Sequence, residues 1–170
     1  MILVPFDVNN TDVRQHFLKQ TLLDAMNSLT ERTEPLWGRM TAQHMVEHLT
    51  WTYELSTGRT EVHRDIPENL IARTKKFLYD NTPTPHDFKN PIISENPPPL
   101  RFESLADSKK VLREEMNRFL DHIPEKLEVI HNHPLFGPLR SDEWQRCHFK
   151  HCYHHLLQFG LIIGAAPAVG

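Results

Sequence analysis

The sequence predicts an all-α fold, a four-helix bundle with a long proline-rich crossover between its second and third helices. Apolar residues recur at helical spacing in four long segments. Residues 81–100 contain six prolines and no periodic pattern, so they are expected to form neither a helix nor a central strand. Strand-like patterns are confined to two short apolar runs, residues 1–6 and 90–94. Together these observations favour a bundle with one crossover connection.

The first two helices are indicated by their apolar periodicity. The first is expected within residues 9–29, and the second is expected over residues 41–57. The second should end before Gly58, because glycine commonly follows the C-terminus of a helix. The candidates for the N-cap of the first helix are Asn10, Thr11 and Asp12.

A shorter helix and a third long helix lie on either side of the crossover. The shorter one is expected within residues 66–81, with Pro67 in its first turn. The third long helix is expected over residues 104–122, and Pro124 should kink it or restart it.

The last helix follows a segment rich in turn-forming residues. Residues 131–144 are expected to be this turn segment, because they contain a His-Pro and a Gly-Pro pair. The helix is expected from about Glu143 to Ile163, with Ser141 or Asp142 as its cap.

The composition indicates one globular domain over residues 1–170. The formal net charge is −3, so no basic excess points to a nucleic-acid partner. No apolar stretch is long and unbroken enough to span a membrane, and the N-terminus makes a poor signal peptide. Cys147 and Cys152 are spaced too far apart on one helix for a disulfide. Unpaired thiols fit a reducing compartment, and we expect the protein in the cytoplasm.

The most informative segment reads HFKHCYHHLLQ and begins at His148. At ~100° per residue, His148, His151, His155 and Gln158 fall on one helical stripe, whereas His154 points to the side. Two imidazoles four residues apart can aim at one point, which is a chelating arrangement for a divalent metal ion. A pair of hydrogen-bonded core histidines explains the same spacing equally well.

A complete metal site needs a third ligand from another helix. His48 is the candidate, because it lies at the border of the apolar stripe of the second helix, beside Met45, Leu49 and Thr52. His44 lies one turn earlier and is turned further towards the polar side.

Three segments carry a resemblance to a known superfamily. KHCYHHLLQFG resembles the C-terminal signature of the DinB/YfiT-like superfamily of metal-dependent enzymes, in which a helix carries His-x-x-His-His-x-x-Gln. WGRMTAQHMVEHLTW is similar to the early helix of that superfamily, where a histidine follows a tryptophan-containing turn. HPLFGPLRSDEW resembles the segment before the last helix in an uncharacterised branch. The resemblance spans residues 37–159 and agrees with the expected helix order.

The resemblance implies a four-helix bundle that holds one divalent metal ion through three histidines. Zinc or nickel is expected first, and iron or manganese are the alternatives. The middle histidine of the signature is His154, which the superfamily does not generally use as a ligand. Leu156 and Leu157 stand where an Arg-Gly pair is common, so a role of that arginine in holding an acidic group is not implied here. The implied ligands are His48, His151 and His155.

Three neutral imidazoles would leave such a metal its full charge and an open position. This suits hydrolysis of a small-molecule substrate or the transfer of a low-molecular-weight thiol. The resembling superfamily includes thiol-dependent transferases and isomerases that use mycothiol or bacillithiol, and its members are commonly homodimers. The alternative is a non-catalytic protein of the same fold, a metal-binding or dimeric scaffold.

The sequence identifies no catalytic residue, but it offers further site candidates. His148, His154 and Gln158 are candidates for supporting a ligand or lining a pocket. Glu47 is a candidate general base that is expected to face away from His48. The three tryptophans either line the pocket or pack in the core; they are Trp37, Trp51 and Trp144.

Overall fold

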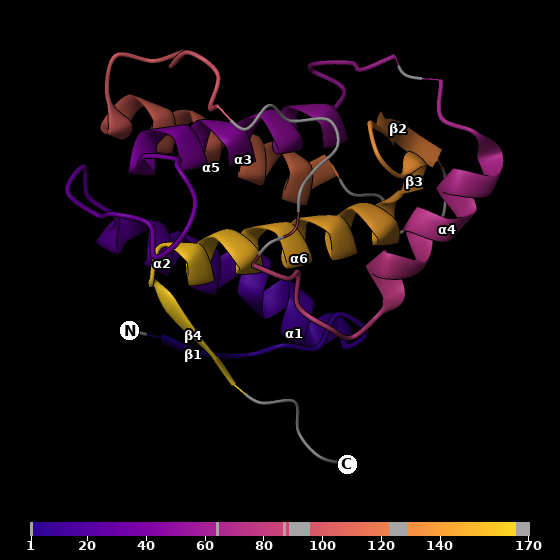
Figure 1. The fold of residues 1–170 in the computed structure, drawn as a ribbon, viewed down its shortest axis with the longest axis horizontal. Coiled ribbons are helices and arrows are strands. Elements are labelled where there is room, and N and C mark those ends of the chain that lie inside the picture. The colour runs from indigo at the N-terminus through magenta and orange to yellow at the C-terminus, as the bar shows by residue number, and fades with distance from the viewer. Residues whose placement is uncertain (1, 64, 87, 89–95, 123–128, 166–170) are drawn as a thin grey trace.

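The computed structural model describes residues 2–63, 65–86, 88, 96–122 and 129–165. The chain is mostly helical and carries a small amount of sheet (Figure 1). The helices are α1 (Thr11–His16), η1 (Phe17–Thr21), α2 (Leu22–Ser28), α3 (Ala42–Ser56), α4 (Glu68–Tyr79), α5 (Leu105–His122) and α6 (Ser141–Gln158). The strands are β1 (Ile2–Pro5), β2 (Val129–His133), β3 (Gly137–Arg140) and β4 (Ile162–Ala165).

The first predicted helix is confirmed as the continuous run of α1, η1 and α2. Asn10 is its N-cap, and the Asn10 side chain accepts hydrogen bonds from the backbone N–H groups of Asp12 and Val13. The middle segment η1 is a π-helical turn, a local widening of the helix that leaves the chain helical on both sides.

The second and third long helices are also confirmed, as α3 and α5, which pack along each other. Thr41 caps α3, because its hydroxyl accepts a hydrogen bond from the backbone N–H of His44. The shorter helix forms as α4, with Pro67 at its N-cap. The expectations for Pro124 and for residues 90–94 concern residues outside the described part of the chain.

The prediction for the last helix is wrong at its C-terminus. α6 ends at Gln158, and Gly160 adopts a φ of +63°, a left-handed conformation that ends helices. Residues beyond it form β4, which pairs in parallel with β1 at the other end of the sequence. Ile162, which was expected within the last helix, therefore lies in a strand.

The N-terminus of α6 also differs from the prediction. Its N-cap is Arg140 rather than Ser141 or Asp142, and the Glu143 side chain accepts a hydrogen bond from the Arg140 backbone N–H. The expected turn segment before it is an antiparallel hairpin of β2 and β3. The all-α expectation therefore holds for the helices but misses two small sheets.

Helix α6 lies at the centre of the helical layers. Figure 1 shows it between the α3–α5 pair and the first helix, and α6 contacts elements of both. Its buried Phe149 and Tyr153 meet Phe6 and Phe17 in an aromatic cluster with ring centroids 4.9–5.9 Å apart. Trp144 is fully buried, so it packs in the core. Among the described residues, no helix combines the length and apolar character needed to cross a bilayer.

Candidate metal centre

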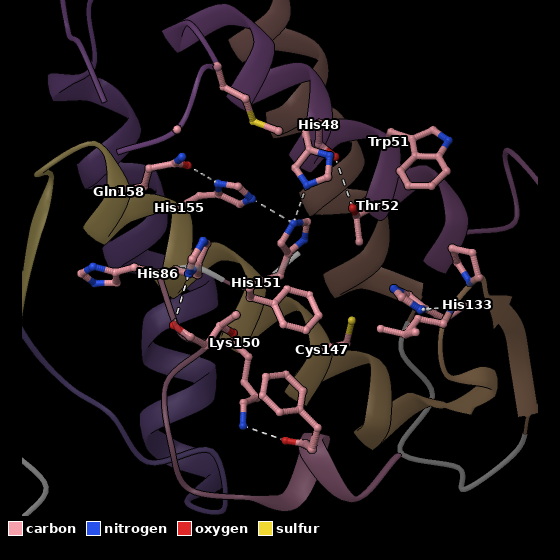
Figure 2. A pocket seen from close by; sticks show the side chains of 18 of the residues that line it. His48, Trp51, Thr52, His86, His133, Cys147, Lys150, His151, His155 and Gln158 are labelled. Carbon is pink, nitrogen blue, oxygen red and sulfur yellow. Dashed lines mark hydrogen bonds between the residues drawn. The ribbon is translucent and has the colours of Figure 1, made fainter. Parts of the chain in front are cut away.

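Helices α3 and α6 bring three imidazoles together where they face each other (Figure 2). His48 comes from α3, and His151 and His155 come from successive turns of α6. The Nε2 atom of His151 lies 2.7 Å from Nε2 of His48 and 3.1 Å from Nε2 of His155. The possible ligand atoms of this histidine triad all lie within 4.8 Å of one another, so one metal ion can be held by all three.

Burial keeps the triad in the form that binds metal. Burial, with a smaller contribution from the neighbouring His154, lowers the pKa of His48 to about 4. Burial, followed by the nearby histidines, also holds the pKa values of His151 and His155 well below the usual imidazole value. The three rings are therefore neutral at pH 7, and a neutral imidazole offers a lone pair to a cation.

Gln158 orients one member of the triad. The Nδ1–H of His155 donates to Oε1 of Gln158 over 2.7 Å, which leaves the Nε2 lone pair of His155 facing the other two rings. The Gln158 amide in turn donates to the Trp37 carbonyl over 2.8 Å. The sequence-based proposal that Gln158 supports a ligand thus has a defined geometry.

The structure does not bring His148 to the triad, although it shares the predicted stripe. Its Nε2 lies 2.8 Å from the Ser56 hydroxyl, and its ring stacks on Tyr53 at 3.8 Å. Burial lowers its pKa well below the usual value, so it is a neutral core residue. Ser56 is the last residue of α3, so His148 meets a later turn of α3 than the turn that carries His48.

His154 lies beside the triad rather than within it. Its Nδ1 is 3.4 Å from the Thr84 carbonyl of the crossover, and its ring meets the edge of Trp37. Trp37 also stacks on His86, with ring centroids 3.8 Å apart. His86 and Thr84 show that the crossover covers this part of the site.

The triad opens onto a cavity of about 720 Å³, hereafter the cavity. The largest part of its wall is aromatic or aliphatic, which suits an apolar molecule. Among the described residues that line it, none carries a carboxylate. The lining residues that the sequence did not identify come mainly from α4, the hairpin and α6: Phe77, Leu78, His133, Pro134, Leu135, Phe136, Cys147 and Lys150.

Lys150 lies on the cavity wall, but its charge is directed elsewhere. Its ammonium donates to the carbonyls of Phe77 and Asp80, over 2.7 and 2.5 Å. Burial lowers the pKa of Lys150 to about 8. The aliphatic part of the Lys150 side chain, rather than its ammonium group, therefore lines the cavity.

The carboxylate that the sequence places beside His48 belongs to a different structure. Glu47 accepts hydrogen bonds from the backbone N–H groups of Arg101 and Phe102 and from Ser108, at the junction of the crossover with α5. It does not line the cavity. Glu47 therefore anchors the crossover and is not positioned as a general base.

Comparison with known proteins adds one family match. Residues 81–160 are similar to a family described as proteins of unknown function (DUF1569), and this match covers slightly less than half of the chain. It includes the crossover, α5, the hairpin and α6, with His151 and His155 but not His48. No curated protein and no solved structure matches the chain.

Proposed function

We propose that this protein is a metal-dependent enzyme with the DinB/YfiT-like four-helix-bundle fold. The observation that carries the proposal is the convergence of three neutral imidazoles at the wall of a large apolar cavity. In the proposed bundle, the four long helices are the run of α1 to α2 and helices α3, α5 and α6. The shorter α4 lies between α3 and the proline-rich crossover.

The triad would hold one divalent ion through the Nε2 atoms of His48, His151 and His155. All-nitrogen ligation favours zinc or nickel, with iron or manganese as alternatives. Three protein ligands leave an open position, which distinguishes catalytic sites from closed structural ones. When bound, such an ion would acidify a water or a thiol and polarise a carbonyl.

Of the two reactions that such a site supports, transfer of a low-molecular-weight thiol fits the cavity better than hydrolysis. A hydrolase commonly uses a carboxylate as its general base, and none of the described residues that line the cavity carries one. Thiol transfer needs no separate base once the thiol is acidified. The apolar wall then suits an apolar electrophile as the second substrate.

The first test is metal analysis of protein purified without a histidine tag. We expect about one equivalent of metal in the wild type and in His154→Ala, and loss of the metal in His151→Ala. His154 is the matched control, because it neighbours the triad on the same helix without joining it. Equal metal content in the wild type and in a variant lacking all three triad imidazoles would overturn the proposed site.

The second test separates an enzyme from a scaffold. The metal-loaded protein is assayed with glutathione, mycothiol, bacillithiol and cysteine against an aryl halide, and in parallel against ester and amide substrates. We expect thiol conjugation that disappears with the metal. Full metal occupancy without turnover in either assay would favour the alternative, a metal-binding or dimeric scaffold.

A further inference from the structure

A second polar group faces the same cavity away from the triad. His133, at the end of β2, lines the cavity wall beside Phe136 and Cys147. Its Nδ1 accepts hydrogen bonds from the backbone N–H groups of Leu135 and Phe136, over 3.1 and 3.3 Å. A nitrogen that accepts carries no hydrogen, so a neutral His133 must carry its hydrogen on Nε2.

The His133 ring is held neutral and in place. It stacks on Phe136 at 4.6 Å and meets the edge of Trp144 at 5.4 Å. Burial lowers the pKa of His133 to about 3, so the ring is uncharged at physiological pH. One tautomer in one orientation therefore presents an N–H donor.

That donor has no hydrogen-bond partner among the described residues. Figure 2 shows the second ring nitrogen of His133, Nε2, on the side that faces Cys147 and His151. This side lies opposite the hydrogen bonds made by Nδ1. The turn-capping role of Nδ1 explains why a histidine stands in the hairpin, but it leaves the Nε2–H group unused.

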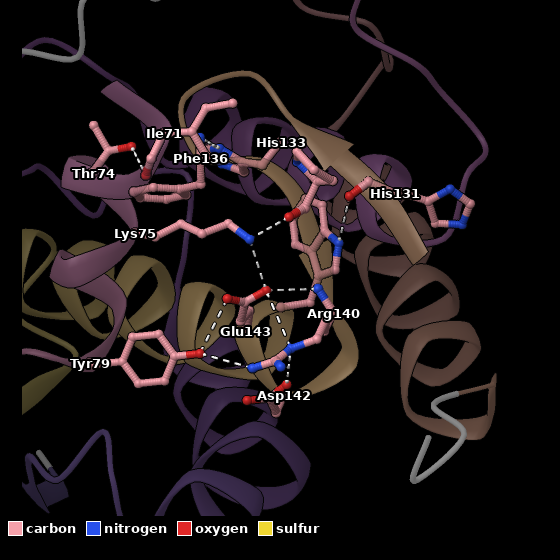
Figure 3. Close-up of polar contacts among 12 residues, drawn as sticks. Ile71, Thr74, Lys75, Tyr79, His131, His133, Phe136, Arg140, Asp142 and Glu143 are labelled. Carbon is pink, nitrogen blue, oxygen red and sulfur yellow. Dashed lines mark hydrogen bonds and ion pairs between the residues drawn. The ribbon is translucent and has the colours of Figure 1, made fainter. Parts of the chain in front are cut away.

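The hairpin that carries His133 is held by contacts with the neighbouring helices. The Thr74 hydroxyl of α4 donates to the Leu135 carbonyl over 3.1 Å, and the Lys75 ammonium donates to the Pro138 carbonyl over 2.6 Å (Figure 3). Lys75 also pairs with Glu143 of α6 at 3.2 Å. The hairpin is thus fixed to two helices, as a ligand-positioning group requires.

We infer that His133 is a substrate-positioning residue, whose Nε2–H donates a hydrogen bond to a neutral carbonyl oxygen of a substrate bound at its other end to the triad metal. The inference rests on the proposed metal site and adds the substrate class: an apolar molecule with a metal-binding group at one end and a ketone, ester or amide carbonyl at the other. A carboxylate fits less well, because the rings against His133 are apolar and carry no compensating cation.

The test uses cobalt-loaded protein and alkanethiols as probes. Each probe carries a methyl ketone at its far end, and its control carries an isopropyl group of the same shape. A probe with a terminal carboxylate is the third arm. Alkyl chain length is varied, because the carbonyl reaches His133 only at a matching length. The thiolate-to-cobalt charge-transfer band gives the dissociation constants, and calorimetry measures the same pairs without relying on that band.

Two variants separate the two nitrogens of His133. In His133→Asn, the amide oxygen replaces the Nδ1 acceptor and the Nε2–H donor is lost. In His133→Gln, the amide nitrogen replaces the Nε2–H donor and the Nδ1 acceptor is lost. We expect the ketone-to-isopropyl affinity ratio at the best chain length to fall about tenfold in His133→Asn and to recover in His133→Gln, since a carbonyl buried without a donor is disfavoured.

The outcomes distinguish this inference from the proposed function. A charge-transfer band with an unchanged affinity ratio in a folded His133→Asn variant overturns the role of His133 and leaves the metal site standing. In another outcome, the ketone-to-isopropyl affinity ratio falls in His133→Asn by calorimetry while no charge-transfer band is seen. That result supports His133 as the donor and overturns thiol binding at the metal. If the carboxylate probe binds more tightly than the ketone, the neutral-carbonyl assignment is wrong.

Discussion

The direction of a single hydrogen bond decides what His155 offers to a metal. Because its Nδ1 faces the Gln158 oxygen at 2.7 Å, its Nε2 lone pair is left for the triad. The Gln158 amide nitrogen donates to the Trp37 carbonyl, so the amide oxygen is the atom that faces His155 and accepts from its Nδ1–H. One glutamine thus sets the tautomer of a proposed ligand.

Gln158→Leu is expected to weaken metal binding by roughly 10–100-fold, because loss of a partner that orients a ligand typically costs this much. Competition with a chromophoric chelator measures the affinity. The control is Gln20→Leu, because Gln20 is an exposed glutamine of η1 whose side chain donates to the exposed Asp24 and lies outside the cavity wall. Metal affinity that falls equally in both variants would contradict the orienting role.

His133 also makes a prediction about acid stability. Its folded-state pKa of about 3 lies below the unfolded value, so between these values the unfolded chain binds one more proton than the native protein. Its contribution to stability is complete above about pH 6.5 and is lost as the pH falls towards 3, by about 1.4 kcal/mol per pH unit. His133→Asn should lack this slope, so the difference in unfolding free energy between the wild type and the variant should change by this amount per pH unit between pH 6.5 and pH 4. Parallel pH profiles would show that His133 is protonated in the native state.

At the scale of elements, caps and apolar periodicity within a segment predicted the helices correctly. The two small sheets, whose strands pair with other segments of the chain, were missed. The Asn10 cap, the Thr41 cap and the apolar period lie within the segments they define, and those helices form as expected. The hairpin and β4 depend on partners in other segments: β4 pairs with residues 2–5, at the opposite end of the sequence. A short apolar run cannot show whether it continues a helix or pairs with a distant strand.

The candidate site shows the same division. Helical spacing alone places His151 and His155 on one face, and the resemblance adds His48. The same spacing puts His148 on that stripe, although in the structure its neighbour is Ser56 at the end of α3 rather than the triad. His133 could not be predicted, because its place on the cavity wall depends on how the hairpin docks against α4 and α6.

The loop between α2 and α3 approaches α6 at Gly38, where a side chain would have no room. Gly38 has a φ of +85°, and a Cβ atom built there would lie 2.6 Å from Nε2 of Gln158. Gly38→Ala is therefore expected to displace Gln158, lowering metal affinity as well as costing about 1–2 kcal/mol for the left-handed backbone. Thermal denaturation and chelator competition measure the two effects.

Gly160→Ala is the matched control for this loop. Gly160 has a φ of +63°, and its added Cβ would lie at an ordinary 3.7 Å from Leu36. It should show a similar loss of stability with unchanged metal affinity. If both alanine variants bind metal equally well, the contact between Gly38 and Gln158 does not support the site.

Glu47 fixes the junction of the crossover with α5, and its loss would leave partly buried backbone donors without an acceptor. Glu47→Ala removes the acceptor for the backbone N–H groups of Arg101 and Phe102, at an expected cost of about 3 kcal/mol in unfolding free energy. Urea denaturation measures it, with Glu114→Ala on the exposed face of α5 as the control. The metal stoichiometry of Glu47→Ala should equal that of the wild type. A lower metal content in this variant would mean that Glu47 supports the triad.

At the scale of the whole molecule, the triad joins segments that are distant in the sequence. His48 and His151 are separated by 103 positions, and a metal held between them would link α3 to the central helix α6. Such a site is assembled only in the folded chain, because the unfolded chain keeps these ligands far apart. Metal binding and folding are therefore thermodynamically linked.

This linkage gives a prediction that needs no substrate. Zinc at a free concentration 100 times its dissociation constant should stabilise the folded protein by about 2.7 kcal/mol, which raises the midpoint of thermal unfolding by roughly 5–10 °C for a chain of this size. A chelator should reverse the shift. The variant with alanine at all three triad positions should show no shift, whereas His154→Ala should respond like the wild type, because His154 lies outside the triad. A zinc-dependent shift that persists without the triad would place the metal elsewhere in the chain, and an unchanged wild-type midpoint would mean that these imidazoles converge without binding zinc.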